Sequence, residues 1–195
     1  MPILNWLLKE HAIDCAVQAE WADLYRLPRP PRGLTERVQK ALDLYPCDIL
    51  FVHRDAERES WATRALEIAN AVGQVEEGAS VPPLVRVVPV RMQEAWLLFD
   101  EIAIRKAAGN PNGRERLDLP PTRQVERIPD PKERLYELLR LASGLAGRRL
   151  SKLRPRMFAP RVSDFIDDFA PLRALPAFQS LETEVQHAIN QLNLS

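Results

Sequence analysis

Apolar and polar positions along the first half of the chain form blocks that predict strands and helices in turn. Residues 49–52 are a short continuous apolar run, which is typical of a strand buried on both faces of a sheet. A second run, rich in β-branched residues, spans 84–90. Between the two runs, residues 57–72 place apolar side chains at helical spacing. These blocks predict a strand–helix–strand unit.

The segments before this unit continue the alternation. Residues 3–12 and 34–45 show helical spacing of apolar side chains, and residues 14–21 alternate as a strand would. The proline-rich stretch 27–33 predicts a loop, because proline cannot donate to a helix or to a sheet ladder. Helices between successive strands predict an α/β fold, a parallel sheet flanked by helices on both faces.

After residue 90 the pattern becomes helical. Asp100 and Asp130 are positioned as helix N-caps, and the proline after Asp130 suits a first helical turn. We therefore expect an α/β core over residues 1–100 and a helical C-terminal extension, residues 101–195, packed on it. The helices predicted in the later part are residues 92–100, 101–108, 132–141, 162–169 and 175–192.

Composition is that of a globular protein, with 46% hydrophobic and 28% charged residues in 195. Lys plus Arg and Asp plus Glu are 27 each, so the overall charge does not indicate a nucleic-acid partner. No apolar run reaches the roughly 18 residues of a membrane span, and the N-terminus does not resemble a signal peptide. Cys15 and Cys47 show no metal-ligand spacing, which favours free thiols. We expect a cytoplasmic protein without a membrane partner.

Two carboxylates follow the central strand. Asp55 and Glu57 lie just beyond residues 49–52, where sheets of this kind collect binding residues. If the chain stays extended, both side chains point to one side. Two convergent carboxylates are suitable ligands for Mg²⁺ or Mn²⁺. The alternative is that Asp55 caps the following helix and that Glu57 interacts favourably with its first turn.

Glu94 follows the next strand, residues 84–90, so a parallel sheet places it at the same edge as Asp55. Glu94 would complete a metal site. The alternative is that Glu94 is an acidic residue in the first turn of the helix predicted over residues 92–100. We expect Trp96 to lie in the core. His53 has two interpretations as well, a general base or a histidine at the rim of the core.

Several basic residues are candidates for phosphate contacts. Arg54 and Arg91 flank the acids and would neutralise them or bind phosphate, and Lys132 lies near a helix N-terminus that favours anions. Residues 148–156 hold five basic residues in nine positions, a pattern that suits a nucleic-acid backbone. The alternative is a solvated helix paired with nearby acids. The candidates in this run are Arg148, Arg149 and Lys152.

Three motifs together resemble a known family. Residues 51–57 (Phe-Val-His-Arg-Asp-Ala-Glu), the segment 88–100 with its Glu-Ala-Trp-Leu-Leu-Phe-Asp, and Asp-Pro-Lys at 130–132 resemble a bacterial family of unknown function with a TOPRIM-like core. Members of such families often occur near ATPases of mobile-element or phage-defence systems. The resemblance covers most of the chain and implies a TOPRIM-like parallel sheet.

In the TOPRIM pattern, a glutamate after the first strand and an Asp-x-Asp after the third hold Mg²⁺ for phosphodiester chemistry. Asp55-Ala56-Glu57 resembles that acidic pair, with Glu57 in place of the second aspartate. Glu94 and Asp100 match further acidic positions of the family. The first-strand glutamate has no counterpart, because the chain begins at what resembles the family's first helix. One interpretation is that Met1 is an internal start.

Two functions follow as hypotheses. The first is a Mg²⁺-dependent phosphodiesterase or nuclease subunit, active in phage defence with an ATPase partner. Asp55 and Glu57 would be metal ligands, and Glu94 a third ligand or general base. The second is a non-catalytic TOPRIM-like interaction module that binds an ATPase or nucleic acid, DNA or RNA; the missing acid and the zero net charge favour it. A nucleotide-binding protein of the doubly wound type is a weaker third, because no glycine fingerprint is present.

Overall fold

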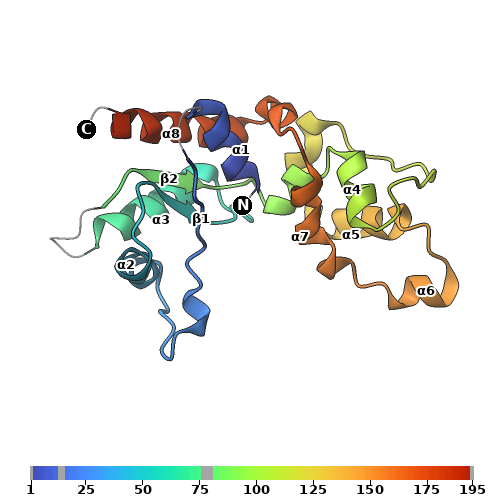
Figure 1. Ribbon diagram of the computed structural model, residues 1–195, viewed down its shortest axis with the longest axis horizontal. Coiled ribbons are helices and arrows are strands. Elements are labelled where there is room, and N and C mark those ends of the chain that lie inside the picture. Colours follow the sequence, from blue (N-terminus) through green and yellow to red (C-terminus); the bar gives the residue numbers. More distant parts are fainter. Residues whose placement is uncertain (1, 13–15, 76–80, 194–195) are drawn as a thin grey trace.

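The structure is a computed structural model that describes residues 2–12, 16–75 and 81–193. It is a mixed α/β fold in which helices predominate and two short strands form a parallel sheet (Figure 1). Figure 1 shows the sheet with α1, α2, α3 and α8 at one end of the molecule and α4 to α7 at the other. The α-helices are α1 (Pro2–His11), α2 (Leu34–Leu44), α3 (Trp61–Gly73), α4 (Glu101–Ala107), α5 (Pro131–Ala142), α6 (Gly147–Lys152), α7 (Ala159–Val162) and α8 (Pro176–Asn193).

Short 3₁₀ helices, labelled η, fill several connections between these elements. They are η1 (Leu24–Arg26), η2 (Gln93–Leu97), η3 (Thr122–Arg127), η4 (Pro155–Met157), η5 (Ser163–Phe165) and η6 (Ala170–Ala174).

The sheet pairs β1 (Leu50–His53) with β2 (Leu84–Val87), and Leu50 lies opposite Leu84. α3 connects the strands, so the strand–helix–strand unit predicted from the apolar runs is confirmed. β2 ends before residue 90, because Pro89 lacks the N–H that the next position of the ladder requires.

The prediction of a third strand over residues 14–21 is wrong for the residues in this range that the structure describes. Residues 16–23 form no helix or strand, and residues 14 and 15 lie outside the described residues. Val17 nevertheless packs against the main core. Alternating apolar residues reflect such local burial, whereas a strand also requires a distant partner for its backbone groups.

Helices cover both faces of the strand pair. Leu50 and Val52 of β1 pack with Ile68 of α3 in a small core that also takes a residue from α2. Val85 and Val87 of β2 join the main core on the opposite face. This two-sided burial explains why both strands read as continuous apolar runs.

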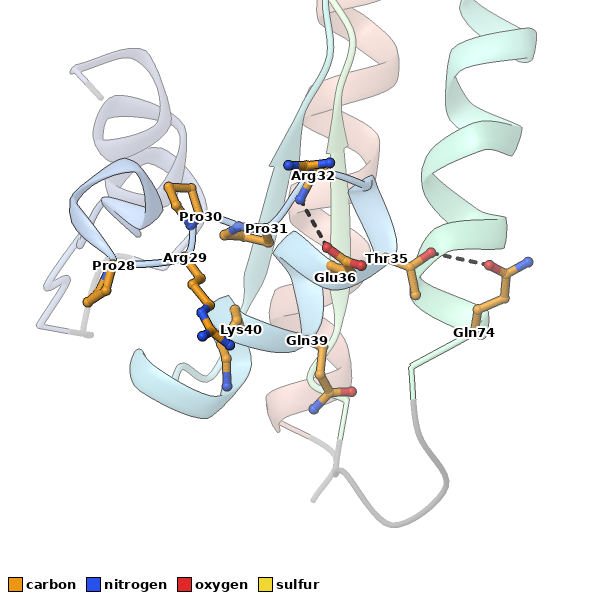
Figure 2. Close-up of a pocket in the computed structure, with 10 residues that line it drawn as sticks. All are labelled: Pro28, Arg29, Pro30, Pro31, Arg32, Thr35, Glu36, Gln39, Lys40 and Gln74. Carbon is orange, nitrogen blue, oxygen red and sulfur yellow. Dashed lines mark hydrogen bonds between the residues drawn. The ribbon is translucent and has the colours of Figure 1, made fainter.

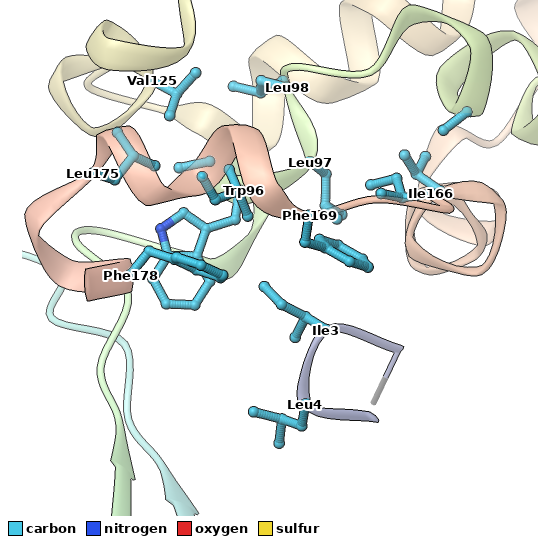
Figure 3. Packing of buried hydrophobic residues seen from close by; sticks show 14 of the residues in the cluster. Ile3, Leu4, Trp96, Leu97, Leu98, Val125, Ile166, Phe169, Leu175 and Phe178 are labelled. Atoms are coloured by element: carbon cyan, nitrogen blue, oxygen red, sulfur yellow. The ribbon is translucent and has the colours of Figure 1, made fainter. Parts of the chain in front are cut away.

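The main core draws side chains from α1, α4, α5, α7 and α8 and from β2. Trp96 is 1% exposed and meets Phe178 of α8 edge-on, with 5.7 Å between ring centroids (Figure 3). Phe169 makes a similar contact with Trp6 of α1 at 6.0 Å. The expectation that Trp96 anchors the core is confirmed, and burial of these rings is a large source of stability.

α8 also closes the outer edge of β2. The backbone N–H of Arg86 donates to Glu184 Oε2 at 2.7 Å, and the Arg86 guanidinium lies 2.8 Å from Glu184 Oε1. A side chain from the end of the chain thus satisfies a donor that an open sheet edge would leave exposed.

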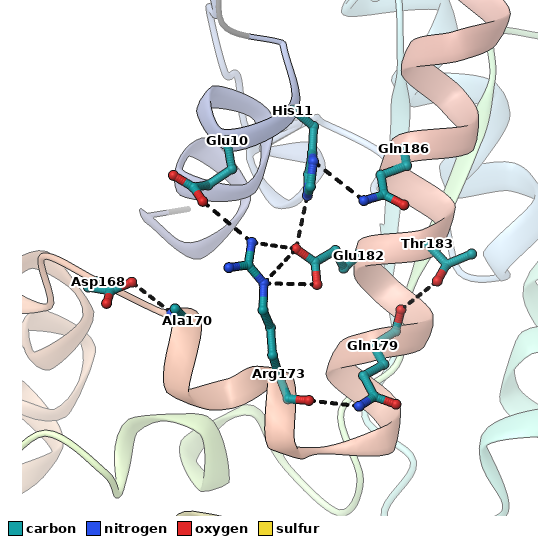
Figure 4. A network of polar contacts seen from close by, with 9 residues as sticks. All are labelled: Glu10, His11, Asp168, Ala170, Arg173, Gln179, Glu182, Thr183 and Gln186. Atoms are coloured by element: carbon teal, nitrogen blue, oxygen red, sulfur yellow. Dashed lines mark hydrogen bonds and ion pairs between the residues drawn. The ribbon is translucent and has the colours of Figure 1, made fainter.

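A polar network fixes α8 to α1 (Figure 4). Glu182 accepts a hydrogen bond from Arg173 Nη2 at 2.7 Å, and its Oε1 lies 2.9 Å from His11 Nε2. Burial alone raises the pKa of Glu182, but the hydrogen bonds from Arg173 and His11 outweigh it and hold the pKa below its usual range. The same pairing raises the pKa of Arg173.

Both predicted N-caps in the helical part are confirmed. The Asp100 carboxylate accepts from the N–H of Ala103, and the Asp130 carboxylate accepts from the N–H of Glu133, each at 2.9 Å. Pro131 opens α5 at the position that the sequence predicts.

The helix predicted over residues 162–169 is only partly present. Val162 ends α7, η5 continues to Phe165, and the backbone then becomes extended at Ile166. Asp168 accepts from the N–H of Ala170 at 2.8 Å, a local bond that competes with helix continuation. None of the described helices is long and apolar enough to span a membrane.

Candidate functional site

The carboxyl ends of β1 and β2 leave the sheet side by side. Beyond the strands, the N–H of Arg54 donates to Val87 O and the N–H of Ala56 donates to Pro89 O, both at 3.0 Å. This continued pairing brings the two strand-end segments to one edge, which we call the carboxyl edge (residues 53–57 and 91–94).

The backbone at this edge turns sharply in two places. Glu57 and Arg91 both adopt left-handed conformations, with φ of 54° and 61°. The N–H of Glu57 donates to Arg91 O at 2.9 Å, so the two turns are joined. A non-glycine residue in this region costs about 1–3 kcal/mol, and such residues collect at functional sites. The strain marks the carboxyl edge as a candidate site.

Asp55 is held by the segment that carries Glu94. Its Oδ1 accepts from the N–H of Gln93 at 3.1 Å and lies 3.4 Å from His53 Nε2. Asp55 therefore satisfies the first donor of η2. It does not cap α3, whose N-cap is Ser60, accepting from the N–H of Thr63.

Glu57 points to a different partner. It is 64% exposed on its side chain, and its Oε2 lies 3.7 Å from Arg64 Nη2. Because its left-handed backbone interrupts the alternation of an extended chain, Glu57 does not share the contacts of Asp55. Arg64 binds Glu67 more closely, at 2.8 Å, and this hydrogen bond raises the pKa of Arg64.

Glu94 is half-buried in η2, one residue after the donor that Asp55 caps. Within residues 2–12, 16–75 and 81–193, no three His, Cys, Asp or Glu residues are grouped closely enough to hold a metal ion. Asp55, Glu57 and Glu94 thus do not fit a three-ligand Mg²⁺ site in this arrangement. The metal site stays a prediction.

The basic residues near the edge have mainly local roles. Arg54 Nη2 donates to Glu67 Oε1 at 2.8 Å, so Arg54 and Arg64 neutralise the same carboxylate. Arg91 accepts the Glu57 hydrogen bond through its carbonyl. Lys132 is exposed in the first turn of α5, where Asp130 already occupies the N-cap.

A different kind of surface surrounds α6, residues 147–161, which we call the basic segment. It holds six basic residues and no acid, and all six are exposed. α6 buries none of its side chains and lies at the far end of the molecule from α8 (Figure 1). The six residues are Arg148, Arg149, Lys152, Arg154, Arg156 and Arg161.

None of these six forms an ion pair with any residue that the structure describes. Arg161 contacts the ring of Phe165 at 5.7 Å, which leaves its charge uncompensated. Many arginines elsewhere lie against a carboxylate. Examples are Arg54, Arg64, Arg86, Arg105, Arg134, Arg140 and Arg173.

The uneven charge is a property of the whole chain. Since basic and acidic residues are 27 each, six basic residues in this segment leave 21 basic against 27 acidic elsewhere, a net charge of −6. The alternative of a helix paired with nearby acids therefore has no support among the described contacts. The basic run predicted from the sequence ends at residue 156. The absence of acidic residues from 143 to 163 is the signal that would have extended this run to Arg161.

No protein-family model matches the chain, and no match is found among curated proteins or solved structures. The resemblance to a TOPRIM-like family stays a prediction.

Proposed function

We propose that this protein is a non-catalytic interaction module that binds DNA or RNA through the phosphate backbone, with the basic segment as the contact. The observation that carries the proposal is the set of six exposed basic side chains without a carboxylate partner in the described residues. The rest of the chain has a net charge of −6, so the basic segment differs in the sign of its charge from the remainder of the chain.

Electrostatics favours a polyanionic partner for this segment. Arg148 and Lys152 are four residues apart in α6, where like charges destabilise a helix by about 0.2–0.5 kcal/mol. A phosphate backbone would remove this repulsion and release its own counterions. The basic residues follow one another along the chain from 148 to 161, an arrangement that suits a linear partner.

DNA and RNA are linear polyanions, and binding them through phosphates requires no catalytic group in the protein. Phosphate contacts position a protein without reading sequence, so we expect little sequence preference from this segment alone. The ATPase partner implied by the family resemblance is a separate prediction.

A Mg²⁺- or Mn²⁺-dependent phosphodiesterase is the second proposal, favoured by the two joined left-handed residues, Glu57 and Arg91. Asp55 would have to release the N–H of Gln93, and Glu57 would have to turn from Arg64. Calorimetric titration with Mn²⁺ tests it. Stoichiometric binding that Asp55→Ala abolishes would support this proposal, and no binding would contradict it.

The nucleic-acid proposal is tested with a triple variant, Arg148→Gln, Arg149→Gln and Lys152→Gln. Fluorescence anisotropy of a labelled 20-nucleotide DNA reports the affinity at low salt. Because three phosphate contacts are removed, we expect the affinity to fall roughly 10- to 100-fold.

A matched control removes the same amount of charge elsewhere. Lys9→Gln, Arg58→Gln and Arg123→Gln change three exposed basic residues, each with an acid within three positions in the sequence. We expect this variant to bind almost as the wild type does. Equal losses in the two triple variants would mean that net charge, not the basic segment, determines binding.

A further inference from the structure

A second exposed surface lies on the segment that precedes α2, which we call the arm, residues 16–33. Figure 1 shows the arm, in blue, extending away from α8 toward the level of α2. It carries two large aromatic side chains in solvent: Trp21 is 65% exposed and Tyr25 is 74% exposed. Both are among the most exposed large apolar residues described, and they lie four positions apart.

The ring of Tyr25 is held in place although it is exposed. The Arg37 guanidinium of α2 lies over this ring, 5.6 Å from its centroid. Arg37 Nε also donates to the carbonyl of Pro31, a buried residue. One side of the ring is therefore braced against α2, while most of its surface remains open to solvent.

The arm also carries basic side chains. Arg29 and Arg32 are exposed, and neither guanidinium has an ion-pair or hydrogen-bond partner among the described residues. Together with Lys40 they line an open hollow of about 810 Å³ between the arm and α2 (Figure 2). Its one acidic residue, Glu36, accepts from the backbone N–H of Arg32 at 3.0 Å.

The prolines make this surface stiff. Pro28, Pro30 and Pro31 form part of the wall of the hollow, and each fixes its own φ. A segment that is already rigid loses little conformational entropy when a partner binds. Arg29 and Arg32 are thus presented on a rigid support.

We propose that the arm binds single-stranded nucleic acid, with bases stacked on Trp21 and Tyr25 and phosphates contacted by Arg29 and Arg32. The inference rests on the proposed function and deepens it by naming the strand state of the nucleic acid. Exposed aromatic rings and unpaired cationic side chains on one segment are the combination that proteins use to bind single strands. A duplex keeps its bases stacked internally, so it would use the charges but not the rings.

The test compares Trp21→Ala and Tyr25→Ala with Leu66→Ala, which removes an exposed apolar side chain (60% exposed) from α3. Each full-length protein is titrated with labelled oligothymidylate of 20 nucleotides, with a duplex of equal length, and with heparin, a polyanion without bases. Loss of one stacked base predicts a roughly 5- to 150-fold weaker affinity for the single strand. Affinities for duplex and heparin should change less than twofold, and Leu66→Ala should match the wild type.

The outcomes separate this inference from the proposed function. If the arm variants bind oligothymidylate as the wild type does while the basic-segment triple variant is weakened, the arm proposal is overturned and the function stands. If only the arm variants are weakened, the arm proposal stands and the basic segment is not the contact. Equal losses for heparin and oligothymidylate would overturn base stacking, and no binding by the wild type would overturn both proposals.

Discussion

At the scale of single residues, Trp96 and Glu126 show how a buried ring contacts a half-buried carboxylate. The Trp96 indole N–H donates to Glu126 Oε1 at 3.2 Å from within the core. Burial raises the pKa of Glu126, and the hydrogen bond from Trp96 opposes the shift only in part. The folded protein therefore favours the neutral carboxyl more than the unfolded chain does.

This pKa shift predicts a pH-dependent effect of Glu126→Gln. A raised folded-state pKa gives a stability contribution that is present below the unfolded-state pKa and is lost as the pH rises through the folded-state pKa. The glutamine oxygen can still accept from Trp96 and never ionises. We expect a higher urea midpoint than the wild type at pH 7 and an equal midpoint near pH 4. A lower midpoint at pH 7 would mean that the ionised Glu126 stabilises the fold.

The sequence predicted Trp96 in the core, because a large aromatic residue within the continuous apolar run 95–99 is stabilised most by burial. It did not predict the role of Asp55. An aspartate after a strand suggests a cap for the next helix in sequence, whereas Asp55 satisfies η2, a helix that follows the next strand. Local sequence patterns do not indicate a contact between residues 38 positions apart. Such a contact exists only because the parallel strands bring their carboxyl ends together.

At the scale of elements, the strongest predictions were those with both periodicity and a cap. α5 has an N-cap, a first-turn proline and an amphipathic pattern, and it begins where predicted. α3 was predicted to begin at residue 57 but begins at Trp61. Glu57 is left-handed and the N–H of Glu59 bonds back to Ala56 O, so a turn occupies the first positions.

The cap that Asp55 provides can be measured. Asp55→Ala leaves the N–H of Gln93 without its acceptor, so we expect a loss of about 1 kcal/mol in the free energy of unfolding. Asp55→Asn keeps an acceptor oxygen and should cost less. Denaturant unfolding measures both. If the basic segment is the nucleic-acid contact, neither variant should change oligonucleotide affinity. A loss of affinity at unchanged stability would instead support a direct role of Asp55 in binding nucleic acid.

At the scale of the whole molecule, the two ends of the chain complete the fold. Glu184 satisfies the edge of β2 at Arg86, and Glu182 links α8 to α1. No local pattern indicates which distant helix covers a sheet, so the sequence predicted α8 as a helix but not its position. The separation of charge, in contrast, was visible in the sequence as an acid-free stretch, and the structure adds that its basic side chains are exposed and unpaired among the described residues.

The most direct test of the account is the salt dependence of single-strand binding by the wild type and by the Arg148→Gln, Arg149→Gln, Lys152→Gln variant. Each phosphate contact contributes about 0.7 to the slope of the logarithm of the association constant against the logarithm of salt concentration. If the basic segment contacts phosphates, the variant's slope should be smaller in magnitude by about 2. Identical slopes for the two proteins would show that these side chains touch no phosphate and would contradict the central claim.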